Sequence, residues 1–149
     1  MKKFLYILTL FTLLTQFTLH SQQWRVFTTS NSPLPSNFVG NIAIDTNNVK
    51  WIGTSNGLAQ LNGNTWIIYD TTNSGIPANS MSAFAIDKDN HLWVGSSEKG
   101  AAKFDGINWT IYNTSNSGLP SNAVFNISID KYNVKWIATF GGGLAKFND

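Results

Sequence analysis

The chain carries a repeated arrangement of apolar and polar positions that predicts a β-hairpin. In each copy an apolar run leads into an Asp-x-x-Asn tetrapeptide, and a Trp-led run of β-branched and small residues follows. Two strands joined by a tight turn have this pattern. The copies span residues 44–54, 86–96 and 129–139. The sequence therefore predicts three antiparallel hairpins.

The spacing of the hairpins predicts a β-propeller. Trp51 and Trp93 are 42 residues apart, and Trp93 and Trp136 are 43 apart. A period of about 40–45 residues is typical of one four-stranded propeller blade. We therefore expect an all-β fold of three repeats, each contributing four antiparallel strands. The repeats are residues 24–65, 66–108 and 109–149.

The alternation of side-chain sizes predicts which strand of each blade is innermost. Residues 39–45, 81–87 and 124–130 alternate large apolar with small or polar side chains. Blades that stack a large face on a small one can close around an axis, so we expect these inner strands to be covered on both faces. The Trp-led strands are then outermost. Trp24–Phe27 is predicted as an outer strand that precedes the first complete blade.

The N-terminus has the features of a secretory signal peptide. Lys2 and Lys3 precede an uncharged apolar stretch over residues 4–19. This stretch is shorter than the ~20 residues that a spanning helix needs. We expect residues 1–21 to be removed after Ser21, in preference to an uncleaved anchor, leaving residues 22–149 without a stable membrane span. The predicted location is secreted or periplasmic.

Charge and cysteine content exclude several function classes. The chain has 10 basic and 8 acidic residues, and losing Lys2 and Lys3 leaves 8 of each. Nucleic-acid binding requires a basic surface that releases counterions, so we expect no nucleic-acid partner. The chain has no cysteine, hence no disulfide and no thiolate metal site. We expect packing alone to stabilise the exported domain.

Residues that recur at one position in every repeat are interpreted as structural. They are Trp24, Trp51, Trp66, Trp93, Trp109 and Trp136, together with Asp45, Asp87 and Asp130. The tryptophans are predicted to pack blade on blade, with carbohydrate stacking as the less favoured alternative. The aspartates are predicted to accept hydrogen bonds from turn amides. The turn lacks the ligand alternation of a calcium loop, so we expect neither a metal nor a cofactor.

Differences among the repeats point to a candidate ligand-binding surface. The loop between the second and third strands contains Ser55 and Asn56, Glu98 and Lys99, or Phe140. These five are the predicted ligand-binding residues. Phe140 has no aromatic counterpart in the other repeats, so it is either a stacking contact or buried under a neighbouring loop.

No catalytic residue can be named from the sequence. His91 is the only histidine outside the leader, and its counterparts are Val49 and Val134. Without a second base or an activated nucleophile, no acyl-transfer site can be assembled. The carboxylates of Asp70, Glu98 and Asp105 leave a propeller-type polysaccharide lyase or hydrolase as the alternative function.

The repeat resembles the two-component regulator propeller repeat over nearly all of residues 24–149. The shared motifs are the Asp turn, Trp-Ile-Gly-Thr, Gly-Leu, Asp/Asn-Gly, Trp-x-x-Tyr and Asn-Ser-Gly-Leu-Pro-Ser-Asn. The resemblance implies an extracytoplasmic sensor-type propeller, which in that family precedes a membrane span and a histidine kinase. This sequence contains neither. We therefore expect a binding module for a neutral polar ligand, such as an oligosaccharide or peptide, or for a protein partner. The alternative is a truncated fragment of a longer sensor.

Three blades are too few for a closed propeller, which has ~4–8. Two chains would supply six blades, with Trp24–Phe27 of each completing the third blade of the other. A homodimer that closes a six-bladed ring and a fragment of a longer propeller are the two expectations left open.

Overall fold

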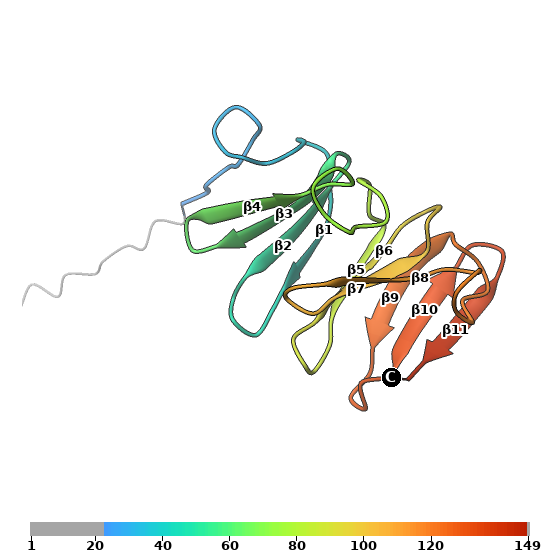
Figure 1. Ribbon diagram of the computed structural model, residues 1–149. Helices are drawn as coiled ribbons and strands as arrows, with labels where there is room; N and C mark the ends of the chain where they lie inside the picture. The colour runs from blue at the N-terminus through green and yellow to red at the C-terminus, as the bar shows by residue number, and fades with distance from the viewer. Residues whose placement is uncertain (1–22, 149) are drawn as a thin grey trace, which may run out of the picture.

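The computed structural model describes residues 23–148, which form three antiparallel β-sheets and no helix. The sheets follow one another in a row (Figure 1) and are called blades 1, 2 and 3. This arrangement confirms the predicted all-β propeller architecture.

Each blade follows the order of its strands along the chain. Blade 1 contains β1 (Val39–Ile44), β2 (Lys50–Thr54), β3 (Gly57–Asn62) and β4 (Thr65–Tyr69). Blade 2 contains β5 (Ala83–Ile86), β6 (Leu92–Gly95), β7 (Ala101–Phe104) and β8 (Trp109–Tyr112). Blade 3 contains β9 (Val124–Ile129), β10 (Lys135–Thr139) and β11 (Gly143–Phe147).

The Asp-x-x-Asn tetrapeptides form the turns of the three predicted hairpins. The amide of the asparagine donates to the carbonyl of the aspartate at 2.9–3.0 Å in all three turns. Asn48, Asn90 and Asn133 have φ of 62°, 66° and 68°. Asparagine tolerates this left-handed conformation better than most residues, which explains its recurrence at the fourth position.

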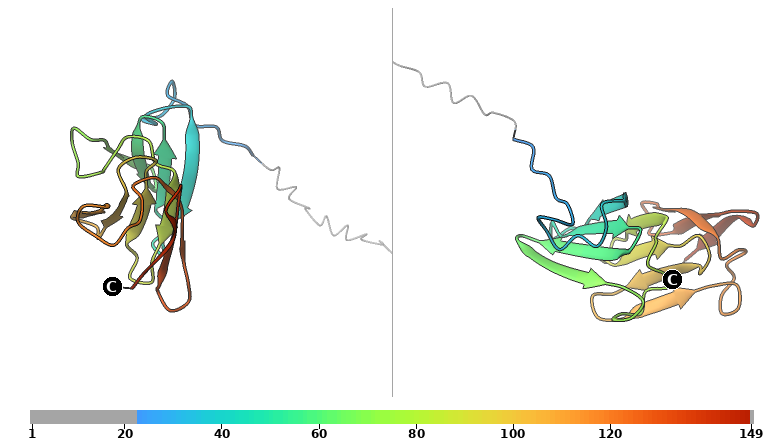
Figure 2. Two further views of the ribbon diagram at one scale, coloured as in Figure 1. Left: turned by 90° about the vertical axis from the view of Figure 1, so that its right-hand side faces the viewer. Right: turned by 90° about the horizontal axis from the view of Figure 1, so that it is seen from above.

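The predicted inner strands lie side by side. β5 contacts both β1 and β9. In the view from above in Figure 2, the three blades spread apart with distance from these inner strands. Two hydrophobic clusters fill the junctions between successive blades. Trp51 and Leu58 lie in the cluster between blades 1 and 2, and Trp93 and Ile127 lie in the cluster between blades 2 and 3. The core is therefore the set of blade junctions.

The two junctions repeat the same aromatic contacts. Phe104 of blade 2 packs edge-on against Trp51 and Tyr69 of blade 1, with ring centroids 5.7 and 5.6 Å apart. Phe147 of blade 3 lies 5.7 and 5.2 Å from Trp93 and Tyr112 of blade 2. Equivalent residues therefore meet in equivalent ways at each junction.

Two expectations at the start of the blade row were wrong. Residues 24–27 form no strand, and Trp24 is 91% exposed instead of buried. Ile42 and Ile44 of β1 are also exposed, so this inner strand is covered on one face only. The physical reason is the same for both: in this structure no blade precedes blade 1, so the segment has no strand to pair with and the face has no neighbour.

The predicted signal peptide, residues 1–21, lies outside the described residues. Within residues 23–148, no helix has the length and apolar character needed to cross a membrane.

Candidate functional site

The blades have two ends, and the predicted ligand-binding residues lie at one of them. The Asp-x-x-Asn turns lie at the lower edge of the view in Figure 1. The opposite end carries the β2–β3, β6–β7 and β10–β11 turns and the long loops that lead into each inner strand. This end is called the loop face.

Hydrogen bonds between neighbouring blades hold the loop face in place. The amide of Gly57 donates to the carbonyl of Asn79 at 2.9 Å, and the amide of Gly100 donates to the carbonyl of Asn122 at 2.8 Å. Gly57 and Gly100 have φ of 125° and 88°, a region that favours glycine. Each turn is thereby fixed to the loop of the following blade.

Most loop asparagines hold their own loops together. Their side chains exchange hydrogen bonds with backbone groups of the same loop or the adjoining strand; they are Asn31, Asn37, Asn73, Asn79, Asn113, Asn116 and Asn122. A ligand therefore finds fewer available amides than the composition of the loops indicates. Specific contacts with a ligand would therefore have to come mainly from the residues that differ among the repeats.

The five predicted residues are all exposed, but they lie on three separate turns. Ser55 and Asn56 belong to blade 1, Glu98 and Lys99 to blade 2, and Phe140 to blade 3. The hydroxyl oxygen of Ser55 lies 2.9 Å from that of Ser36. The structure places all five at the loop face without joining them in one pocket.

Phe140 is solvent-facing and is not covered by a neighbouring loop. Its side chain is 80% exposed, while its amide donates to the carbonyl of Ala123 at 2.8 Å. Of the two interpretations left open by the sequence, burial is therefore wrong in this structure. A hydrogen bond thus holds the backbone of Phe140, and its ring is accessible to solvent.

A pocket of about 220 Å³ lies at the loop face between blades 1 and 2. It is lined by Phe38, Val39, Gly40, Thr54, Ser55, Ser80 and Met81. Ser55 is the predicted residue that contributes to it. This volume is below the ~300 Å³ of a typical ligand pocket, so the pocket is small.

The sequence interpretation missed two exposed aromatic residues. Phe38 lines the pocket and is 81% exposed, and Phe125, at a β-bulge where β9 begins, is 74% exposed. The equivalents of Phe38 are Ser80 and Ala123, so neither other repeat carries an aromatic there. The comparison of repeats that selected Phe140 would also have selected these residues.

At the opposite end, each repeat aspartate organises its turn as predicted. Each carboxylate accepts hydrogen bonds from two turn amides at 2.8–3.0 Å. It also accepts from a tryptophan indole, which the sequence interpretation did not foresee. The pairs are Trp51 to Asp45 at 3.3 Å, Trp93 to Asp87 at 3.1 Å and Trp136 to Asp130 at 3.0 Å.

These hydrogen bonds keep the carboxylates of Asp87 and Asp130 ionised. Burial acts to raise the pKa of Asp87, but bonds from the His91 backbone, the Trp93 indole and the His91 ring outweigh it and lower the pKa. The Trp136 indole is the main cause of the lowered pKa of Asp130. Both residues are therefore hydrogen-bond acceptors at neutral pH and poor general acids.

Asp87, Asp89 and His91 form a cluster whose ligand-type atoms lie within 4.8 Å of one another. Besides the turn amides and indole, the Asp87 carboxylate lies 3.1 Å from the Nδ1 of His91 and 3.9 Å from the ammonium of Lys135. Neighbouring protein groups thus already engage Asp87, and a cation there would face the charge of Lys135. The geometry favours a structural role for this cluster.

The three carboxylates considered for catalysis do not form one site. Asp105 follows β7, whereas Glu98 precedes it, so they lie at opposite ends of blade 2. Hydrogen bonds from Thr72 lower the pKa of Asp70, and those from the amides of Asn108 and Ile107 lower the pKa of Asp105. Asp105 instead lines an open groove of about 610 Å³ between blades 1 and 2, together with Asp45 and Asp89.

Comparisons with known proteins agree with this architecture. Residues 75–98 match the family model described as two component regulator propeller. No curated protein sequence matches the chain. The extracellular domain of a hybrid two-component system from B. thetaiotaomicron is 27% identical, with a TM-score of 0.66, over 74% of this chain and 16% of that one.

Two more distant solved structures share the fold. PorZ, a surface component of the type-IX secretion system of Porphyromonas gingivalis, is 21% identical with a TM-score of 0.56, over 80% of this chain and 22% of that one. Virginiamycin B lyase from Staphylococcus aureus is 15% identical with a TM-score of 0.53, over 75% of this chain and 41% of that one. The chain thus spans less than half the length of these structures. The family match thus identifies a two-component regulator propeller repeat at residues 75–98, and the blade geometry agrees with a propeller of such repeats.

Proposed function

We propose that this chain is an extracytoplasmic, sensor-type propeller module that binds a neutral polar ligand, an oligosaccharide or a peptide, at its loop face. The observation that carries the proposal is the exposed Phe140 ring, which the repeat does not require and which sits on a hydrogen-bonded backbone. An exposed aromatic held in a fixed position at a loop face is suited to contact a partner.

The surroundings of the aromatic residues favour a hydroxyl-rich or amide-rich ligand. Phe38 lines the pocket between blades 1 and 2 together with Ser55 and Ser80. A sugar ring or peptide group stacks its apolar face on an aromatic ring and exchanges hydrogen bonds with hydroxyls and amides. The extracytoplasmic location is supported by the solved relatives, which are an extracellular domain and a bacterial surface component.

The test is a glycan and peptide array probed with the full chain, followed by titration of the best ligand. Phe140→Ala should weaken binding by about 3- to 10-fold, the equivalent of ~0.5–1.5 kcal/mol for a lost aromatic contact. Tyr132→Ala is the matched control, because Tyr132 is an exposed aromatic in a turn at the opposite end. This control should leave the dissociation constant unchanged.

Two outcomes would count against the proposal. An array with no binding above background would remove the ligand altogether. Equal losses from Phe140→Ala and Tyr132→Ala would show that the loop face is not the binding surface.

A further inference from the structure

We propose that a second copy of this chain docks on both ends of the blade row, and that residues 24–27 of each copy form the fourth strand of blade 3 in the other. The two ends expose the same positions that are buried at the junctions inside the chain. The junctions inside the chain therefore serve as a template for the contact between blade 3 of one copy and blade 1 of the other.

The junction of blades 1 and 2 contains a tryptophan from the outermost strand. Trp109 of β8 stacks on Phe104 with ring centroids 4.7 Å apart, and it lies 6.1 Å from Tyr69. A Cβ added to Gly75 would lie 2.9 Å from the Cβ of Trp109. The glycine in the preceding loop thus makes room for the tryptophan of the fourth strand.

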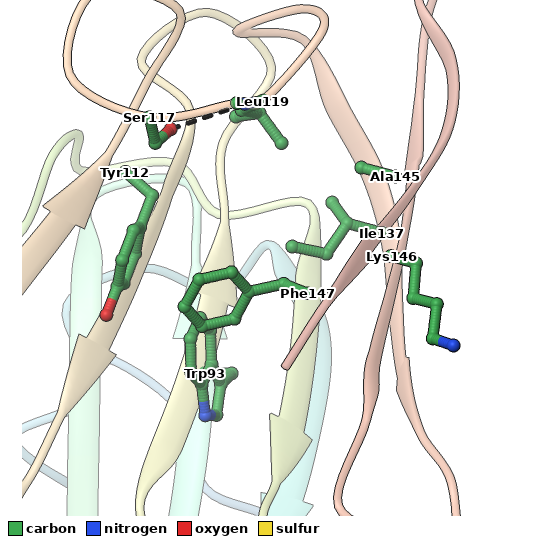
Figure 3. Close-up of a pocket in the computed structure, with 9 residues that line it drawn as sticks. Trp93, Tyr112, Ser117, Leu119, Ile137, Ala145, Lys146 and Phe147 are labelled. Atoms are coloured by element: carbon green, nitrogen blue, oxygen red, sulfur yellow. Dashed lines mark hydrogen bonds between the residues drawn. The ribbon is translucent and has the colours of Figure 1, made fainter. Parts of the chain in front are cut away.

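The junction of blades 2 and 3 repeats this arrangement but has an apolar cavity of about 90 Å³ beside it. Its walls include Tyr112, Gly118 and Phe147, the equivalents of Tyr69, Gly75 and Phe104. Figure 3 shows the Phe147 ring beside Trp93, with Tyr112 across from them. The shape of the neighbouring junction indicates that a tryptophan on a strand next to β11 fits against this wall.

Trp24 is the tryptophan with the matching position in the repeat. It precedes Trp66 by 42 residues, as Trp66 precedes Trp109 by 43, and it is 91% exposed. Leu144 of β11 is 64% exposed, whereas its equivalents Leu58 and Ala101 are fully buried beside a fourth strand. Leu58 and Ala101 belong to the clusters shared with the following blade, so blade 1 of the other copy would cover Leu144, and blade 3 would cover Trp24.

Residues 24–27 already lie where the outer strand of a preceding blade belongs. Phe27 packs edge-on against Trp66 at 5.5 Å, as Tyr69 packs against Trp109. The side-chain amide of Asn31 donates to the carbonyl of Val26 at 3.1 Å, matching the bond from Asn73 to Ile68 at 3.1 Å. The segment is thus held in the correct place relative to blade 1.

The same chain does not bring this segment to its own blade 3. Both Figure 1 and the view from above in Figure 2 show residues 24–27 beside blade 1 and β11 at the other end of the row. In the proposed pair, the second copy supplies the fourth strand of blade 3.

The charges at the two ends are complementary. At the junction of blades 2 and 3, the buried ammonium of Lys135 lies 3.9 Å from Asp87 and 5.2 Å above the Trp93 ring. Lys50 is the equivalent of Lys135 at the open end of blade 1. Asp130 and Trp136, the equivalents of Asp87 and Trp93, lie in blade 3. Docking would place Lys50 beside Asp130 and Trp136.

The asparagine turns add a third matching contact. Asn90 accepts from the Thr46 amide at 2.8 Å, and Asn133 accepts from the Lys88 amide at 3.0 Å, so each links its turn to the preceding blade. Asn48 is exposed at the end of blade 1. In the docked pair its side chain would meet the amide of Lys131 in the other copy, which is the equivalent position.

Two copies joined at both ends contain six blades, within the ~4–8 of closed propellers. The two contacts are identical and related by a two-fold axis, so the assembly closes and does not grow into a filament. It also covers the exposed apolar side chains at both ends, which otherwise favour association.

Light scattering after size-exclusion chromatography of the full chain, exported and purified, tests the assembly. We expect a mass twice that of one chain, and Trp24→Ala should raise the dimer dissociation constant at least 10-fold. Ile107→Ala is the control because Ile107 is also a highly exposed apolar residue but lies in the β7–β8 turn, away from both ends. A monomer at every concentration would overturn the proposal, because the two ends would then not bind a second copy. An open series of larger oligomers would also overturn it.

A disulfide trap tests the strand exchange itself. Ala59 pairs with Ile68 in blade 1, and Ala102 pairs with Ile111 in blade 2. Ala145 should pair in the same way with Val26 of the other copy. Because the chain has no cysteine, Val26→Cys with Ala145→Cys should give a covalent dimer on oxidation. Val26→Cys with Ile107→Cys should stay monomeric on a non-reducing gel. A disulfide within one chain, or none, would show that the exchange does not occur.

Discussion

At the scale of single residues, the junction of blades 2 and 3 buries a charged pair that the other junction does without. Lys135 is fully buried near Asp87, whereas Leu92 occupies the equivalent position opposite Asp45. Both aspartates keep their hydrogen bonds from two turn amides and one indole. The aspartate, and not the lysine, therefore organises the turn.

This difference leads to a prediction for two substitutions. Asp87→Ala should lower the free energy of unfolding by ~3–5 kcal/mol, since it removes the acceptor for two turn amides and the Trp93 indole and takes a carboxylate away from the buried Lys135 ammonium. Lys135→Leu should change it by less than ~1 kcal/mol, because a buried apolar residue can replace a buried charge and Leu92 shows that the site accepts leucine. Urea unfolding measures both. If Lys135→Leu cost as much as Asp87→Ala, the ion pair itself would be the stabilising element.

At the scale of the elements, the turns of the loop face depend on close approach between strands and loops. Gly100 begins the return from the β6–β7 turn with φ of 88°, and an added Cβ would lie 2.2 Å from the carbonyl oxygen of Tyr112. Gly106, in the β7–β8 turn, has φ of 100° and no atom within 4 Å of an added Cβ. An alanine at Gly106 would therefore have only backbone strain, whereas an alanine at Gly100 would have both backbone strain and a steric clash.

Alanine substitutions should therefore differ in cost. Gly106→Ala should destabilise by ~1–2 kcal/mol through backbone strain alone. Gly100→Ala should cost a further ~1–3 kcal/mol because β8 must move away. Thermal unfolding of the two variants is the measurement. Equal losses would mean that the approach of Tyr112 to Gly100 is not needed for stability.

At the scale of the whole molecule, several lowered carboxyl pKa values together predict acid sensitivity. Hydrogen bonds lower the pKa of Asp70, Asp87, Asp105 and Asp130 in the folded chain. In the unfolded chain an aspartate titrates near ~3.9. Their contribution to stability is therefore complete above that value and is lost as pH falls through the lower, folded pKa values.

We expect the urea midpoint to be nearly constant from neutral pH down to about 5 and to fall steeply below about 4. Asp87→Asn should flatten this acid limb, since one of the linked groups is removed, although the variant starts from a lower stability. A midpoint that rose on acidification would contradict the assignment of these carboxylates as ionised acceptors.

Local sequence features predicted most of the architecture correctly. The Asp-x-x-Asn turns, the inner strands and the three-strand third blade agree with the structure, because turn chemistry and alternation act over only a few residues. The candidate site was predicted in part. Phe140 was placed on an exposed loop, but Phe38 and Phe125 were missed, although the same comparison among repeats would have selected them. Their exposure itself could not be predicted, because an exposed ring and a core ring look alike in sequence until the neighbouring blade is known.

The sequence by itself determined the hairpins, the repeat period and the order of the strands within each repeat. Only the tertiary structure decided how equivalent residues differ in environment. Trp93 is fully buried and Trp24 is 91% exposed, although both recur in every repeat. Lys135 is buried beside Asp87, while the equivalent Lys50 is only half-buried. The physical reason is that a turn is closed by bonds within a few residues, whereas burial of a blade face requires the next blade to be present.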